Sequence, residues 1–316
     1  MTIISDLHAS LRSEVSKVLV GQDEALRLVL LALVCKGHVL LEGVPGIAKT
    51  TLVRTLGAAL GLTFKRVQFT PDLMPADILG TQIFSFQESR FHVVEGPIFT
   101  NLLLADEINR APAKTQSALL EAMQERQVSL EGERRILPQP FLVLATQNPV
   151  EYEGTYPLPE AQLDRFLFKI VLGYPTADEE IRVLEQHRGD TAGFMALLAS
   201  VERVADAESL RQAKEEAMRV DVRPEIVRYL VEMVRRTRSE VRIQLGGSPR
   251  ASLLLQVAAR AQAALEGRDY VIPDDIKQLF VPVLRHRVLL TASAEVEGAG
   301  PDEILRGVAD AVPVPR

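Results

Sequence analysis

The 316-residue sequence is poor in the residues that support disulfide, metal or base-stacking chemistry. It has one cysteine, Cys35, no tryptophan, and five histidines that are not closely paired, so neither an internal disulfide nor a histidine metal cluster is expected. Aromatic residues make up 5% of the chain and the net charge is −6. The sequence therefore shows no evident platform for stacking bases and no overall attraction to a polyanion, which argues against a nucleic-acid-binding role.

Long apolar segments are also lacking. The longest uninterrupted apolar run, which ends at Cys35, is far shorter than the roughly 20 residues that a membrane-spanning helix needs. The opening residues, MTIISDLHASLRSEV, contain no apolar stretch behind a basic patch. We therefore expect no secretory leader, no membrane span and a cytoplasmic location. The chain does have 47% hydrophobic and 25% charged residues, which is ordinary for a protein with a sizeable packed core.

Short apolar runs alternate with helical periodicity over the first 175 residues. Two helical segments, 5–19 and 22–35, precede the first run, and another helix is expected at 115–126. Such alternation predicts an α/β fold with a parallel sheet covered by helices on both faces. The five expected strands are 38–41, 64–69, 102–105, 141–145 and 166–172.

Two segments interrupt this alternation. Residues 71–97 contain two strand-like pieces around 87–90, and residues 127–137 read as a β-hairpin. After Gly173-Tyr174-Pro175 the strand pattern stops and helical periodicity continues to about residue 311. We therefore expect a nucleotide-binding core at 1–175 and an all-α domain at 176–316.

Residues 43–50, GVPGIAKT, fit the phosphate-binding P-loop pattern except that Ala48 stands where glycine is usual. The preceding HVLL predicts a strand and the following TTLVRTLGAAL predicts a helix, which is the context that the motif requires. Backbone N–H groups of such a loop hold phosphate oxygens, its lysine reaches the β- and γ-phosphates, and its hydroxyl binds Mg²⁺. The nucleotide contacts expected here are Gly43, Val44, Pro45, Gly46, Ile47, Ala48, Lys49, Thr50 and Thr51, with Thr50 also a ligand of Mg²⁺.

Acidic and amide side chains follow two other expected strands. The run LLLADE ends in Asp106 and Glu107, the Walker B arrangement. In that arrangement the first carboxylate holds Mg²⁺ and the second orients and deprotonates the attacking water. Asn148 follows the strand at 141–145, where its amide could contact the γ-phosphate or the water. Because Pro149 comes next, Asn148 could equally be a turn residue.

The motifs together resemble the MoxR family of AAA+ proteins over nearly the whole chain. The resemblance is carried by GVPGIAKT, by QFTPDLMPADILG, by the block at residues 96–169 and by GGSPRAS. Alanine before the P-loop lysine is usual in that family. The resemblance implies that the insert near 77–96 is the helix-2 insert of this clade and that 127–137 is its pre-sensor-1 hairpin, both facing the pore of a ring.

The resemblance also implies roles for individual residues. Asn148 matches sensor 1, Arg165 matches the arginine finger and Arg250 matches sensor 2, and all three would assist catalysis beside Glu107. Gly21 and Gln22 match the box that lines the adenine pocket.

Two assignments stay open at this point. Arg165 precedes the last expected strand, so it could serve a neighbouring subunit's phosphate, and Arg110 and Arg126 are rival candidates for that finger. Whether Arg250 serves its own subunit or a neighbour is equally open.

The family resemblance implies a chaperone-like remodeller: a homo-oligomeric, hexameric ring that uses ATP and Mg²⁺ to act on a protein client. MoxR proteins work with partners that carry von Willebrand factor A domains, which this chain lacks, so the partner is expected to be a separate polypeptide. One alternative is a nucleic-acid motor, which Arg134 and Arg135 on the expected hairpin would favour and Glu131 and Glu133 would oppose. The other is a switch in which bound ATP holds a partner until slow hydrolysis releases it.

Overall fold

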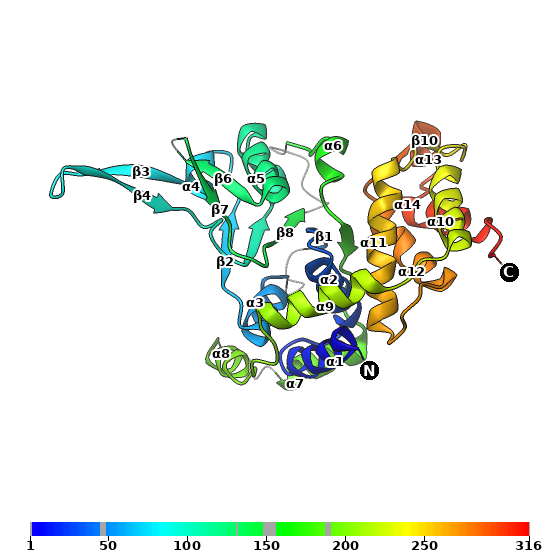
Figure 1. The fold of residues 1–316 in the computed structure, drawn as a ribbon, viewed down its shortest axis with the longest axis horizontal. Coiled ribbons are helices and arrows are strands. Elements are labelled where there is room, and N and C mark those ends of the chain that lie inside the picture. The colour runs from blue at the N-terminus through cyan, green and yellow to red at the C-terminus, as the bar shows by residue number, and fades with distance from the viewer. Residues whose placement is uncertain (1, 45–48, 131, 148–155, 187–190, 316) are drawn as a thin grey trace.

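A five-stranded parallel sheet with the order β2-β5-β8-β1-β9 lies at the centre of the chain (Figure 1). The structure is a computed structural model that describes residues 2–44, 49–130, 132–147, 156–186 and 191–315. The α/β fold predicted from the alternating apolar runs is confirmed. The sheet strands are β1 (Val39–Glu42), β2 (Phe64–Gln68), β5 (Leu102–Asp106), β8 (Leu142–Gln147) and β9 (Phe168–Val171).

The sheet separates two apolar cores. Successive side chains of a strand point to opposite faces, so Leu102 and Leu104 enter one core while Leu103 and Ala105 enter the other. The first core is completed by α1 (Ile3–Ser16), α2 (Asp23–Val34) and α3 (Lys49–Leu60). The second is completed by α5 (Ala113–Glu125). Burial on both faces explains why these strands read as continuous apolar runs.

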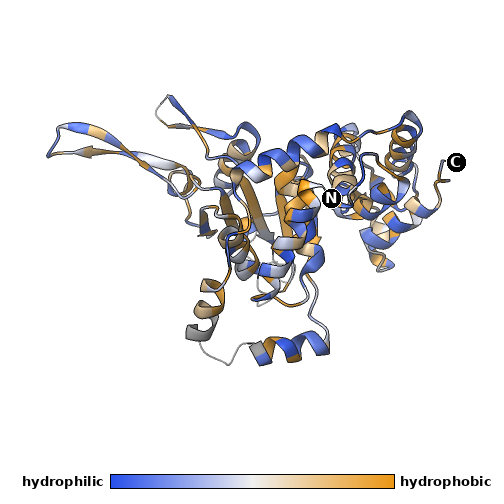
Figure 2. Ribbon diagram, turned by 60° about the horizontal axis from the view of Figure 1, so that its bottom comes forward, coloured by the Kyte–Doolittle hydropathy of each residue, from blue (hydrophilic) through white to orange (hydrophobic). Residues whose placement is uncertain are grey.

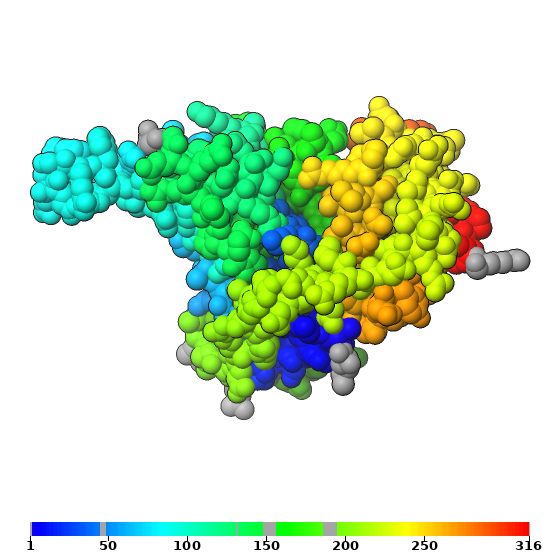
Figure 3. Space-filling view, viewed as in Figure 1, coloured from blue at the N-terminus to red at the C-terminus, as the bar shows by residue number. Residues whose placement is uncertain are grey.

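Two antiparallel hairpins occur where the sequence pattern breaks. The first pairs β3 (Gly80–Ser85) with β4 (Arg90–Glu95) after α4 (Pro75–Leu79), and it projects from the body of the molecule (Figures 1 and 3). The second pairs β6 (Gln127–Leu130) with β7 (Glu133–Ile136). At the base of the first hairpin, Gly80 has φ of 104°, and a Cβ there would lie 2.3 Å from the Val94 carbonyl oxygen. Only glycine fits this close approach of two backbones.

The C-terminal half is mainly helical, and its two short strands, Ile243–Leu245 and Leu289–Leu290, form one antiparallel pair. In Figure 2, α7 and α8 lie away from the sheet, whereas α9 packs on α1 and α2 and leads to the remaining helices. These later helices pack on one another and, through α12, on β9. The boundary expected near 175 stays a prediction. The remaining elements are η1 (Ile108–Arg110), α6 (Glu160–Leu163), α7 (Ala177–Gln186), α8 (Thr191–Ala199), α9 (Ala207–Arg219), α10 (Pro224–Arg236), β10 (Ile243–Leu245), α11 (Pro249–Leu265), α12 (Pro273–Leu284), β11 (Leu289–Leu290), α13 (Ala292–Val296) and α14 (Pro301–Asp310).

A buried histidine ties the start of β1 to its surroundings. The Nδ1 atom of His38 accepts from the Val143 N–H at 3.0 Å, and its Nε2 lies 3.0 Å from the Met123 carbonyl oxygen. These partners require the neutral ring with its proton on Nε2. Burial lowers the pKa of His38 to about 4, and burial also holds the pKa of His286 well below its ordinary value.

We therefore expect the free energy of unfolding to fall as the pH drops. The folded-state pKa of His38 lies below the unfolded value of about 6.5, so the unfolded chain takes up the proton first and stability is lost from about pH 6.5 down to about pH 4. Between pH 7.5 and 5.5 this costs about 1 kcal/mol for His38. Urea titrations at both pH values should show that His38→Gln loses about 1 kcal/mol less than the wild type over this interval. Gln87→Ala, an exposed change on the projecting hairpin that involves no titrating group, is the control and should lose as much as the wild type. An equal loss in the wild type and His38→Gln would contradict the assignment.

Candidate active site

The carboxyl edge of the sheet carries two acidic side chains at the end of β5. Asp106 is the last residue of the strand, and Glu107 follows in a left-handed backbone conformation with φ of 56°. The buried hydroxyl of Thr146, on β8, donates to Asp106 Oδ1 at 2.6 Å and accepts from the Glu107 N–H at 2.8 Å. Thr146 therefore fixes both the Asp106 carboxylate and the turn that takes Glu107 off the strand.

Basic and amide side chains hold the same two carboxylates from the other side. From β2, Arg66 Nε donates to Asp106 Oδ2 at 3.0 Å and Gln68 Nε2 donates to Glu107 Oε2 at 2.8 Å. From η1, Arg110 Nε lies 3.0 Å from Glu107 Oε2. The Glu107 carboxylate is thus oriented by one strand and by the turn that follows its own strand.

Lys49 lies at this edge as well. It is the first residue of α3, and its ammonium donates to the carbonyl of Gly43, directly after β1. Burial lowers the pKa of Lys49, an effect that the negative charges of Asp106, Glu107 and Glu42 oppose. The lysine and both acids therefore share one electrostatic environment, as the P-loop and Walker B motifs predict.

The described residues at this edge suit a magnesium nucleotide. The N-terminus of α3 presents backbone N–H groups, and Lys49 supplies a cation for phosphate oxygens. The Thr50 hydroxyl and the Asp106 carboxylate are hard oxygen donors of the kind that Mg²⁺ takes in phosphate sites, where it keeps few protein ligands. Thr51 also lies in the first turn of α3. The predictions for Pro45, Gly46, Ile47, Ala48 and Asn148 fall outside the described residues.

Gly21 and Gln22, expected at the adenine, lie between α1 and α2 and line a cavity of about 780 Å³. Gly21 has φ of 75°, a left-handed backbone conformation that favours glycine. The atoms nearest to a Cβ there would be those of the Glu179 carboxylate, at the end of a flexible side chain that can move away. The cavity has ample volume for a purine and is lined by both apolar and polar side chains. Among the P-loop residues that the structure describes, none lines this cavity.

Three arginines gather at the opposite, amino edge of the sheet. Arg126 ends α5 and donates to the carbonyl of Lys36, while Arg165 Nη1 donates to the carbonyl of Leu120 at 2.6 Å. Both, with Arg250, line a cavity of about 160 Å³ near the start of β1. Since β1 separates this edge from the P-loop, the two edges are roughly 15 Å apart at 3.3 Å per residue.

The sequence explains why Arg250 reaches this edge. Ser248 caps α11 by accepting from the Ala251 N–H, and Pro249 occupies the first helical position. Arg250 therefore lies in the first turn, where its Nε is 3.6 Å from Asp164 Oδ2. The amino edge therefore carries Arg126, Arg165 and Arg250, on the side of the sheet away from Asp106. Arg110 lies at the carboxyl edge, next to Glu107.

Comparisons with known proteins agree with this architecture. The model of the ATPase family associated with various cellular activities (AAA) matches residues 38–168, and that of the AAA lid domain matches residues 235–308. The chain is 46% identical to Chaperone MoxR1 of Mycobacterium tuberculosis, over 96% of this chain and 81% of that protein. It is 34% identical to Protein MoxR of Methylorubrum extorquens, over 98% and 96%. The chain belongs to the MoxR family of AAA+ ATPases.

Two further relatives of this MoxR-family chain span its whole length. An uncharacterized protein of Bacillus subtilis, YeaC, is 48% identical over 100% of this chain and 98% of that protein. The crystal structure of a candidate ATPase from Cytophaga hutchinsonii is 40% identical, with a TM-score of 0.90 over 99% of this chain and 96% of that chain. The family predicted from the motifs and the AAA+ core with its lid are therefore confirmed.

Three residues that contact the acids at the end of β5 belong to no motif in the sequence. Arg66, Gln68 and Thr146 contact Asp106 or Glu107, yet they occupy ordinary strand positions. The only signal was a polar side chain near the carboxyl end of each strand adjoining β5. Within the described ranges, no helix combines the length and apolar character that crossing a membrane requires.

Proposed function

We propose that this MoxR-family protein hydrolyses Mg-ATP between neighbouring subunits of a hexameric ring, and that the cycle remodels or assembles a protein client. The observation that carries the proposal is the separation of the catalytic groups. The acids and Lys49 lie at one edge of the sheet, and three arginines lie at the other, roughly 15 Å away. A single chain cannot bring both sets to one phosphate in this arrangement, but two adjacent subunits can.

The first half of the site would bind the nucleotide and activate water. Lys49 neutralises the β- and γ-phosphates, while Thr50 and Asp106 hold the metal ion. When bound there, Mg²⁺ would supply further positive charge against the phosphates. Glu107, held by Gln68 and by its own backbone bond to Thr146, accepts the proton of the attacking water.

The second half would stabilise charge in the transition state. Arg165 is the proposed finger, with Arg250 beside it and Arg126 lining the same cavity. Guanidinium groups suit this role because they remain charged and match phosphate oxygens with paired donors. On this arrangement Arg250 acts on the neighbour's nucleotide, and Arg110 belongs to the first half because it pairs with Glu107.

The β3–β4 hairpin is the proposed contact for a protein client. Phe84 packs edge-on against Phe86 and Phe91, with ring centroids 5.2 and 5.1 Å apart, yet Phe86 is 89% and Phe91 65% exposed. A group of apolar rings kept in water at the end of a projecting element marks a surface for binding. We propose that a separate protein with a von Willebrand factor A domain brings the client to the ring.

The same group is the observation that favours the rival nucleic-acid motor, since exposed rings can also stack bases. On the second hairpin, Arg135 lies 3.3 Å from Glu133 and 3.8 Å from Glu95, so its charge is shared with acids. This pairing supports the protein client over the nucleic acid.

Phosphate release by the purified protein tests the proposal. We expect ATP turnover with MgCl₂ and none when EDTA replaces it. With ATP bound, the molar mass measured by light scattering should correspond to several subunits. Single-stranded and duplex DNA should leave the rate unchanged. A DNA-stimulated rate that falls steeply with salt would instead favour the motor. Release of a bound von Willebrand factor A protein after one turnover, without change to a client, would favour the switch.

A further inference from the structure

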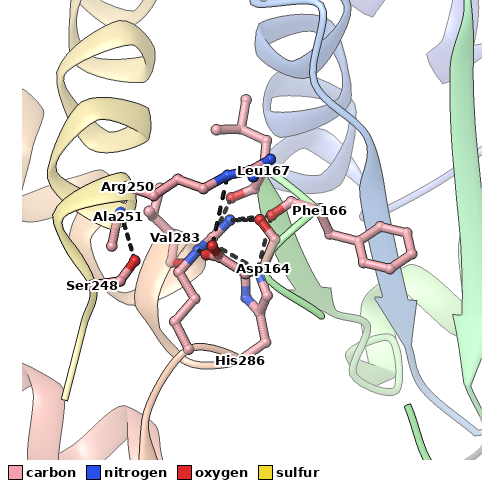
Figure 4. Close-up of polar contacts among 9 residues, drawn as sticks. Asp164, Phe166, Leu167, Ser248, Arg250, Ala251, Val283 and His286 are labelled. Carbon is pink, nitrogen blue, oxygen red and sulfur yellow. Dashed lines mark hydrogen bonds and ion pairs between the residues drawn. The ribbon is translucent and has the colours of Figure 1, made fainter. Parts of the chain in front are cut away.

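One carboxylate lies next to Arg165 in the sequence and beside Arg250 in space. Asp164 immediately precedes Arg165, and its Oδ2 lies 3.6 Å from Arg250 Nε (Figure 4). Its Oδ1 accepts from Arg287 Nε at 2.7 Å. Arg287 follows α12, and its side chain is only 2% exposed.

The Arg287 guanidinium contacts the whole segment around Arg165. Besides the Asp164 carboxylate, Nη2 donates to the carbonyls of Asp164, at 3.2 Å, and Phe166, and Nη1 donates to that of Leu167 at 3.2 Å. The acceptors lie on both sides of Arg165 along the chain. One side chain of the lid therefore fixes the backbone that carries Arg165.

His286 completes this cluster. Its Nε2 lies 3.0 Å from the Phe166 carbonyl oxygen and 2.8 Å from Arg287 Nη1, so the neutral ring can donate to the first or accept from the second. The guanidinium remains charged, because burial lowers the pKa of Arg287 only to about 10, with Asp164 opposing the shift. A buried cation of this kind is costly unless its partners are all in place, so the cluster has a strongly defined geometry.

We propose that Arg287 and Asp164 are positioning residues that join the lid to the Arg165 segment, so that Arg165 and Arg250 meet a neighbour's phosphate as one rigid unit. The proposal rests on the interface site described under the proposed function. Neither residue needs to touch the nucleotide. If the pair is broken, Arg165 and Arg250 lose this common support, while the packing of α12 on β9 and the contact of His286 with Phe166 still join the lid to this edge.

The test uses Arg287→Lys and Asp164→Asn in the full chain. Lysine keeps the charge but cannot bridge the four oxygen acceptors of residues 164–167 with a planar fork, and asparagine keeps one acceptor for Arg287 while it removes the charge. We expect kcat for ATP to fall about tenfold or more in both, because a small displacement of a transition-state group is sufficient for such a loss. The affinity of isolated subunits for a fluorescent ATP analogue should stay within about twofold of the wild type, since the first half of the site is untouched.

Arg268→Lys is the matched control. Arg268 forms a second arginine–aspartate pair of the lid, with Asp275, whose side chain is 3% exposed, and it does not touch residues 164–167. This variant should lose thermal stability comparably to Arg287→Lys but keep kcat within about twofold of the wild type. Equal losses of kcat in Arg268→Lys and Arg287→Lys would mean that general destabilisation, not positioning, explains the effect.

Mixing with Glu107→Gln subunits distinguishes the positioning role from damage to folding. A subunit that carries Arg287→Lys retains an intact first half. A Glu107→Gln neighbour supplies an intact second half, so some turnover should return in the mixture. The positioning role alone would be overturned if kcat were unchanged in both Arg287→Lys and Asp164→Asn. It would also be overturned if mixing with Glu107→Gln restored turnover to Arg165→Ala but not to Arg287→Lys. If Arg165→Ala also fails to recover, the interface site itself is wrong and the positioning role falls with it.

Discussion

Glu107→Gln should reduce ATP turnover about 100-fold or more while the protein still binds ATP, because the amide cannot accept the proton of the attacking water. The substitution is conservative here. The amide oxygen can still accept from Gln68 Nε2, and the backbone bond to Thr146 is unchanged, so the side chain should keep its place. Nucleotide affinity should be equal or higher, since a negative charge near the phosphates is removed.

Phosphate release and equilibrium binding of ATP measure the two effects separately. Glu225→Gln, an exposed change in the first turn of α10, is the matched control and should leave both unchanged. If Glu107→Gln retains turnover within about threefold of the wild type, the general base is another group. A parallel loss of turnover and ATP binding would instead mean that Glu107 supports the binding of nucleotide.

The fold could be predicted from the sequence because burial of a strand on both faces leaves a continuous apolar run in the sequence. β5 and β8 are buried on both faces, so they appear as uninterrupted apolar runs, and the predicted bounds differ from the observed ones by one or two residues. The acids after β5 follow from the same logic, since parallel strands deliver their last side chains to one edge.

The relation between the two edges could not be predicted in this way. Arg250 is about 200 positions from Lys49 in the chain, and nothing in its local motif states which edge of the sheet the first turn of α11 approaches. That placement depends on how α11 packs on α2 and α9 and on the ion pair with Asp164. The contacts of Arg287 with residues 164–167 are equally long-range, since these partners lie 120 and more positions earlier in the chain.

Location separates one of the three candidate fingers from the other two. Arg110 pairs with Glu107 at the carboxyl edge, so it can act only on the nucleotide of its own subunit in the proposed ring. Arg126 and Arg165 line the cavity at the amino edge with Arg250. Arg126 and Arg165 each donate to a carbonyl of their own chain, that of Lys36 and that of Leu120, so these bonds do not distinguish the two. Arg165 stays the proposed finger because its sequence context, Leu163-Asp164-Arg165-Phe166, resembles the finger position of the family.

Arg165→Ala is therefore expected to have the largest effect of any arginine substitution, a loss of turnover of about 1,000-fold. Nucleotide binding should be preserved because the residue lies roughly 15 Å from its own P-loop. Steady-state turnover and ATP binding test both statements, with Arg306→Ala, an exposed change on α14, as the control that should alter neither.

Mixed rings decide whether Arg165 acts on a neighbour. In an equal mixture of Arg165→Ala and Glu107→Gln subunits, about one interface in four combines an intact first half with an intact second half, so measurable turnover should return. Arg110→Ala provides the contrast. Its defect and that of Glu107→Gln lie in the same half, so no interface in that mixture has an intact first half and turnover should not return to the same degree. Recovery with Arg110→Ala but not with Arg165→Ala would reverse the assignment of the two edges.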